Sequence, residues 1–137
     1  MARRILAIVL GLLVAFVFFM LFQATSGAMY PPPPGLDLGD PADLEAYIAT
    51  LPQTALVLVL LGYAVGSLMG GYVTARVATP RQARTPTLIL GAVLTIAAIL
   101  NLRSIPHPTW FAVINLVTFI PLALAGRWLT RLGPSAR

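Results

Sequence analysis

Four long runs of apolar residues dominate the hydropathy pattern of this chain, and none of them contains Asp, Glu, Lys, Arg or His. The runs cover residues 5–22, 55–73, 87–102 and 109–126, and each is 16 to 19 residues long. At a helical rise of about 1.5 Å per residue, each run extends roughly 24 to 28 Å, close to the ~30 Å hydrocarbon core of a bilayer. The pattern therefore predicts an all-α fold, a four-helix transmembrane bundle.

The residues that flank the runs set the expected boundaries of one domain covering 1–137. We expect spans at about 5–28, 54–77, 86–102 and 108–131, with an outer cap over 29–53. Thr85-Pro86 predicts an N-cap followed by a first-turn proline at the start of the third span, and Gly133-Pro134 predicts the end of the fourth. The connection 103–107 is so short that the third and fourth spans must be adjacent and antiparallel.

The first connection has a pattern of its own. Residues 31–34 are four consecutive prolines, which form a stiff polyproline-type segment. Asp40-Pro41 then predicts a helix start with an Asp N-cap. Leu44, Tyr47, Ile48 and Leu51 follow at i, i+3, i+4 and i+7. This spacing predicts a short amphipathic helix in the first outer loop, with one apolar face for the end of the bundle or the lipid interface.

The distribution of charged residues predicts the orientation of the spans in the membrane. The nine basic residues are all Arg and give a net charge of +5. Eight of them gather at Arg3 and Arg4, at 76–84 and at 127–137, and all four acidic residues lie in 37–45. The positive-inside rule then predicts that both termini are cytoplasmic and that the cap faces outward. Because the arginines flank apolar spans, we expect the lipid bilayer and no nucleic acid as their partner.

The N-terminus also resembles a signal peptide. Arg3 and Arg4 precede the apolar run, and Ser26-Gly27-Ala28 resembles a cleavage site. The run of 18 residues is longer than the usual ~7–15 of a signal core. Its length favours retention as a first span.

Stripes of small residues mark the expected helix contacts. Gly62, Gly66 and Gly70 recur every four residues in the second span. The first span carries Ala7, Gly11 and Ala15, and the third carries Thr87, Gly91 and Thr95. Small residues let helix backbones approach closely in lipid. We expect these stripes to meet inside one four-helix unit; the alternative is an interface with another subunit or a second copy.

Polar groups at membrane depth are few: Tyr63, Ser67, Thr95, Asn101, Asn115 and Thr118. An unpaired amide in hydrocarbon is costly, so we expect Asn101 and Asn115 to bond across adjacent helices. Such bonds stabilise by about 0.6 to 2 kcal/mol, which favours a structural role over a solute site.

The outer hairpin holds three further candidates: Arg103, His107 and Trp110. Arg103 is placed to pair with Asp37, Asp40, Asp43 or Glu45 across the outer face. A lone His between two prolines indicates an interface residue, because a metal site needs several ligands. Trp110 and Trp128 are 18 residues apart, which predicts one indole in each interfacial belt.

Several chemistries have no candidate residues. The chain has no cysteine, no carboxylate within a span and one histidine, so we expect no metal, no cofactor, no catalytic triad and no proton relay. We therefore expect that the chain is not an enzyme. Small multidrug transporters would need a membrane-embedded Glu, which this chain lacks.

The segments 30–37, 44–52, 66–71 and 101–111, including Tyr30-Pro31-Pro32-Pro33-Pro34 and Ile105-Pro106-His107-Pro108, resemble a group of uncharacterised small bacterial four-span membrane proteins. The resemblance implies a multi-pass protein of the bacterial cytoplasmic membrane. Our first functional hypothesis is a structural or accessory subunit that packs against partner proteins or itself. The alternative is a small oligomeric transporter or channel for a neutral solute, and a weaker third possibility is pigment or lipid binding between the spans.

Overall fold

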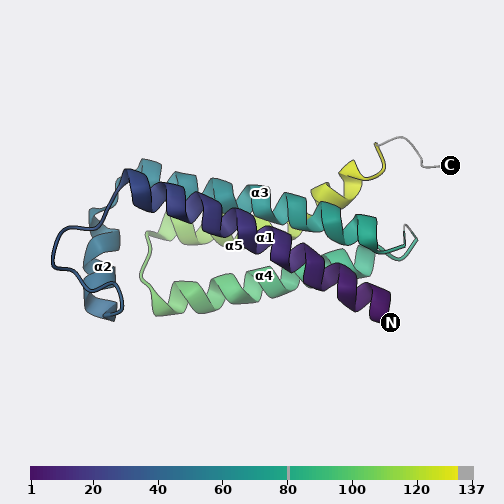
Figure 1. The fold of residues 1–137 in the computed structure, drawn as a ribbon, viewed down its shortest axis with the longest axis horizontal. Helices are drawn as coiled ribbons and strands as arrows, with labels where there is room; N and C mark the ends of the chain where they lie inside the picture. The colour runs from purple at the N-terminus through teal and green to yellow at the C-terminus, as the bar shows by residue number, and fades with distance from the viewer. Residues whose placement is uncertain (80, 133–137) are drawn as a thin grey trace.

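The computed structural model describes residues 1–79 and 81–132, and this part of the chain folds into five helices (Figure 1). They are α1 (Ala2–Met29), α2 (Pro41–Thr50), α3 (Gln53–Val77), α4 (Arg84–Ser104) and α5 (Thr109–Leu129). The four long helices are long and apolar enough to cross a membrane. The predicted four-helix transmembrane fold is confirmed, and the chain is a multi-pass membrane protein. The predicted stop at Gly133-Pro134 lies outside the described residues.

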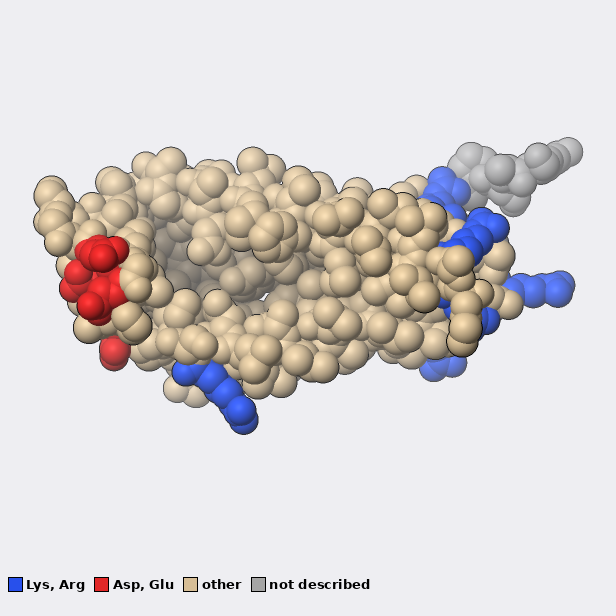
Figure 2. Space-filling view, turned by 60° about the horizontal axis from the view of Figure 1, so that its bottom comes forward, with Lys and Arg blue, Asp and Glu red and all other residues tan. Residues whose placement is uncertain are grey.

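The two ends of the bundle carry opposite charge. Figure 2 shows the acidic side chains gathered at one end and most of the basic side chains at the other. We call the first end the cap end, because α2 lies across it (Figure 1), and the second the arginine end. The start of α1 and the end of α5 both lie at the arginine end. An even number of crossings produces this arrangement.

The loop before α2 is held by its own acidic side chains. The carboxylate of Asp40 accepts a hydrogen bond from the backbone N–H of Ala42 at 2.8 Å, so Asp40 is the N-cap of α2. Asp43 and Asp37 accept hydrogen bonds from the N–H groups of Asp37 and Gly39, both at 2.9 Å. Gly35 has a φ of 92°, a conformation that favours glycine, where the chain turns after the prolines.

The prediction that Thr85 caps the third span is wrong. Helix α4 begins at Arg84, its N-cap is Ala83, and no side chain bonds to this helix end. The first i→i−4 bond runs from the N–H of Thr87 to the carbonyl of Ala83. Pro86 therefore lies in the first turn, where backbone N–H groups have no helical acceptor, and the proline tolerates a helix that begins before it.

Helices α1 and α3 touch through their small-residue stripes. A Cβ built on Gly70 would lie 2.7 Å from the carbonyl oxygen of Gly11, and one built on Gly66 would lie 2.7 Å from that of Ala15. Both distances are shorter than real Cβ contacts. Backbone therefore lies against backbone along this seam, which is how helices associate in lipid.

The remaining small residues face α5. A Cβ on Gly71 would clash with the backbone of Ala123, and a Cβ on Gly126 would clash with the backbone of Leu68. Gly91 of α4 also faces α5, with Ile120 Cα 3.0 Å from its Cβ position. The stripe of α4 thus packs on α5 at Gly91. The sequence pattern did not single out α5 as a partner because its small residues, Ala123 and Gly126, lie three rather than four residues apart.

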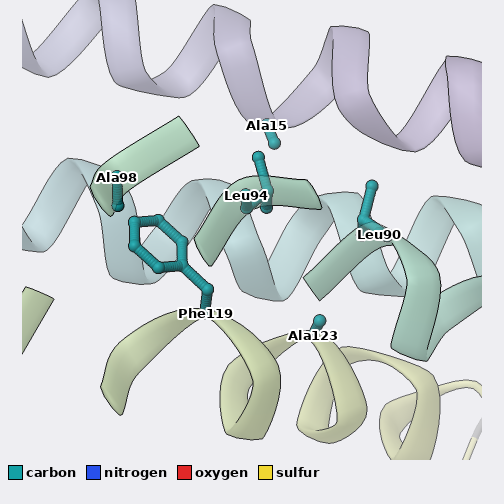
Figure 3. Close-up of a cluster of buried hydrophobic side chains, with 6 residues drawn as sticks. All are labelled: Ala15, Leu90, Leu94, Ala98, Phe119 and Ala123. Carbon is teal, nitrogen blue, oxygen red and sulfur yellow. The ribbon is translucent and has the colours of Figure 1, made fainter. Parts of the chain in front are cut away.

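The centre of the bundle is a cluster of buried apolar side chains from α1, α4 and α5 (Figure 3). Phe119 projects from α5 towards Ala98 of α4. Ala15 of α1, Leu90 and Ala123 are fully buried in the same cluster. Phe119 also lines a cavity between the helices.

Candidate ligand-binding cavity

A cavity of about 650 Å³ lies between the helices and is lined mainly by α1 and α4, with contributions from α3 and α5. Figure 2 shows a deep hollow in the side of the molecule, nearer to the cap end. The volume falls within the range of about 300–1,000 Å³ that is typical of small-molecule sites. The hollow lies along helices whose outer surfaces are apolar, so it faces the lipid phase.

Three aromatic rings from three helices form part of the cavity wall. Phe19 and Tyr63 meet edge to face with ring centroids 5.0 Å apart. Phe119 lies 5.8 Å from Tyr63 and 6.2 Å from Phe19. Aromatic pairs in this geometry are worth about 0.5–1.5 kcal/mol beyond their buried area. The three rings therefore pack against one another where α1, α3 and α5 meet.

Each of the four long helices contributes one hydrogen-bonding side chain to the lining. These side chains are Gln23 of α1, Tyr63 of α3, Asn101 of α4 and Asn115 of α5. The sequence pattern marked Tyr63, Asn101 and Asn115 as polar groups at depth. The sequence pattern did not single out Gln23, because a glutamine directly after an apolar run is typical of the end of a span.

Asn115 is the most buried polar group of the cavity. Its side chain is 1% exposed, and its Oδ1 has no hydrogen-bond partner. The prediction that Asn101 and Asn115 bond across helices is wrong, because both residues lie at the wall of the same cavity and Asn101 remains exposed. An unsatisfied buried carbonyl costs about 1–3 kcal/mol. Oγ1 of Thr74 is also buried without a partner, but Thr74 does not line the cavity, whereas Asn115 does.

The hydroxyl groups at membrane depth behave differently from the amides. Ser67, Thr95 and Thr118 each donate to the carbonyl four residues earlier in their own helix, at 2.6 to 2.8 Å. This pairing is the usual solution for a hydroxyl in a membrane helix. None of the three lines the cavity. These three hydroxyls are satisfied within their own helices, whereas the lining holds the polar side chains of Gln23, Tyr63, Asn101 and Asn115.

The lining is polar at one end and apolar at the other. Gln23, Tyr63, Asn101 and Asn115 all lie in the cap-end half of their helices. The part nearer the arginine end is lined by apolar residues such as Val9, Leu12 and Leu13. No described residue of the lining is charged.

The arginine end of the bundle is closed. Ala7, Ala75, Ala78 and Ala83 form a buried cluster there. The guanidinium Nε of Arg3 donates to the carbonyl of Val77 at 2.7 Å, and that of Arg4 donates to Oε1 of Gln82 at 3.0 Å. These bonds join the start of α1 to the end of α3 and the loop that follows.

Arg103, His107 and Trp110 of the outer hairpin do not line the cavity. The ring of His107 stacks on Phe111 with centroids 4.7 Å apart, and its Nδ1 lies 2.7 Å from the carbonyl oxygen of Ile105. In this contact Nδ1 carries the proton, because the carbonyl can only accept. Trp110 packs against the buried cluster of Leu56, Leu60 and Phe111. Both aromatic residues therefore fix the start of α5.

The expected ion pair of Arg103 is not formed in the described part of the chain. Arg103 is exposed, and Asp37, Asp40 and Asp43 accept hydrogen bonds from backbone N–H groups of their own loop. Those N–H groups lie within a few residues of the carboxylates. Bonding to them therefore costs less conformational entropy than fixing the long side chain of Arg103 on another helix.

Comparison of the chain with protein-family models, with curated proteins and with solved structures found no match.

Proposed function

We propose that this membrane protein binds an uncharged, lipid-soluble molecule in the cavity between its helices. The observation that carries the proposal is Asn115, whose buried Oδ1 lacks a partner at the wall of a cavity large enough for a ligand. Less than 1 Å² of this oxygen is accessible, so the Asn115 side chain would have to turn towards the cavity to accept a hydrogen bond from a ligand O–H or N–H. Such a bond would offset the cost of burying the oxygen. The protein would therefore be more stable with the ligand than without it.

The lining also supports an uncharged ligand. A charged group in a low-dielectric site needs a counter-charge, and no described residue of the lining carries one. The amides of Gln23, Asn101 and Asn115 each offer both donors and acceptors. They suit a neutral molecule that carries hydroxyl, carbonyl or amide groups.

The hypothesis of an accessory subunit has less support. It was motivated by the stripes of small residues, yet Gly62, Gly66 and Gly70 face α1 of the same chain. Close approach of a partner helix at these positions would require α1 to leave. Other lipid-facing surfaces remain available to a partner, but they carry no comparable pattern.

Transport of the bound molecule is also less well supported than binding. A path through the bundle would need an opening at the arginine end, where the alanine cluster and the bonds of Arg3 and Arg4 close it. A binding protein needs only the hollow on the side.

The proposal includes an orientation. We place the arginine end in the cytoplasm and the cap end outside, as the positive-inside rule requires of the seven arginines in the described helices and loops at that end. The resemblance to small bacterial four-span proteins supports placement in a bacterial cytoplasmic membrane.

The test is to identify what copurifies with the protein. The protein is extracted from its native membrane in mild detergent, and bound molecules are measured by native mass spectrometry. We expect a near-stoichiometric uncharged molecule in the wild type and its loss in Asn115→Leu. Thr118→Val is the matched control, because Thr118 is on the same helix but bonds to Ile114 outside the cavity. Equal occupancy in Asn115→Leu and the wild type would contradict the proposal.

A further inference from the structure

We infer that the ligand is a neutral single-chain amphiphile, with its head at the cap end of the cavity and its chain directed towards the arginine end. The inference rests on the proposed function and names the class of molecule bound. It follows from the position of the polar groups along the cavity, from the length of its apolar part along α1 and from the side on which the hollow opens.

The head is placed by the polar side chains. Gln23, Asn101 and Asn115 lie in the cap-end halves of three different helices and all line the cavity. Side-chain amides both donate and accept, so together they suit a head that has an O–H donor and a carbonyl acceptor. A glycerol ester has both groups and no charge.

The chain is placed by the apolar part of the lining. Along α1 the lining runs from Val9 to Gln23, and its apolar section from Val9 to Met20 extends about 16 Å at 1.5 Å per residue. Leu12, Leu13 and Phe16 lie along this section. An apolar section of this length fits an extended hydrocarbon chain. A compact polar solute would leave it empty.

The cavity volume limits the ligand to one chain. About 650 Å³ is typical of sites that hold one drug-sized molecule. Part of that volume is needed for the head beside Asn115. We therefore assign a single hydrocarbon chain.

The hollow also explains how such a molecule would reach the site. It opens on the side of the bundle, nearer to the cap end. The exposed residues beside it, including Leu13, Phe16 and Val93, are apolar. A lipid in the leaflet on the cap side could enter laterally without leaving the hydrocarbon phase, which keeps its chain away from water.

The experiment uses photoreactive monoacylglycerols with the full chain in phosphatidylcholine nanodiscs. One probe carries a diazirine at the end of the acyl chain, and a second carries it beside the ester. We expect the chain-end probe to label residues 9–13 and 93–94, and the ester probe to label residues near 101 and 115. Unlabelled monoacylglycerol should compete, whereas the fatty acid at pH 8 and phosphatidic acid should compete at least tenfold less effectively because they are charged.

Variants separate specific binding from labelling by bulk lipid. Asn115→Leu should lower the apparent affinity for monoacylglycerol about tenfold, as expected for the loss of one hydrogen bond in an apolar site. Thr118→Val should leave it unchanged. Circular dichroism and size-exclusion chromatography of both variants establish that they are folded, and the two label positions in the wild type test the orientation even if a variant fails to fold.

Three outcomes would overturn the inference. The first is the reversed pattern of labels, and the second is labelling that the unlabelled compound does not displace. The third is a cross-link from the cavity to a second polypeptide, which would mean that a protein helix occupies the hollow. If the wild type instead copurifies with another uncharged molecule that Asn115→Leu loses, the proposed function stands and only the class of ligand is wrong.

Discussion

Gly66 of α3 faces Ala15 of α1 with no space for a side chain, because a Cβ on Gly66 would lie 2.7 Å from the carbonyl oxygen of Ala15. The same Cβ would also clash with the ring of Phe19, which forms part of the cavity wall. The seam between α1 and α3 therefore supports the site as well as the fold. A change at Gly66 should affect both.

We predict that Gly66→Ala lowers the free energy of unfolding by about 1–3 kcal/mol, the usual cost of overpacking, and that Gly66→Leu prevents stable folding. Thermal unfolding in detergent measures both. Gly27→Ala is the control, because its Cβ would have open space and the helix gains up to about 1 kcal/mol from alanine. If Gly66→Leu keeps the thermal stability and size of the wild type, the seam does not hold the bundle together.

We predict that Asp40→Ala weakens only α2. The substitution removes the hydrogen bond to the N–H of Ala42, at a cost of about 1 kcal/mol to this helix. Hydrogen exchange at residues 42–50 should become faster, and exchange in the four long helices should stay as it is. Glu45→Ala, on the exposed side of the same helix, should change neither. Equal acceleration in both variants would mean that lost charge, rather than a lost cap, is responsible.

We predict the orientation from the arginines, and cysteine labelling tests it. The chain has no native cysteine, so Ala42→Cys and Arg81→Cys each provide a single thiol at an exposed position. A membrane-impermeant maleimide added to intact cells should label the first and leave the second unlabelled until the membrane is opened. The opposite pattern would place the cap in the cytoplasm.

The sequence predicted the features that depend on local pattern. The four spans follow from apolar runs, and the short helix follows from Asp40-Pro41 and the spacing of its apolar residues. Each of these signals lies within one element. The error at Thr85 arises because a proline is tolerated throughout the first turn and so marks a helix start only approximately.

The cavity could not be predicted in the same way. It depends on how α4 lies relative to α1 in the assembled bundle, where α4 packs closely on α5 at Gly91 and Ile120. Without this geometry, the energetic cost of an unpaired amide favours a bond between Asn101 and Asn115. The two amides became site residues only when the structure placed both at one cavity and left Oδ1 of Asn115 without a partner.

The central claim is that Asn115 is kept for a ligand at a cost in stability. Thermal unfolding of delipidated Asn115→Leu, compared with the delipidated wild type and Thr118→Val, tests it most directly. We predict that Asn115→Leu is at least as stable as the wild type, by up to about 1–3 kcal/mol, because it removes an unsatisfied buried carbonyl. We also predict that monoacylglycerol raises the unfolding temperature of the wild type and Thr118→Val alone. A delipidated Asn115→Leu that is clearly less stable than the wild type would contradict the account, because Asn115 would then be a structural residue.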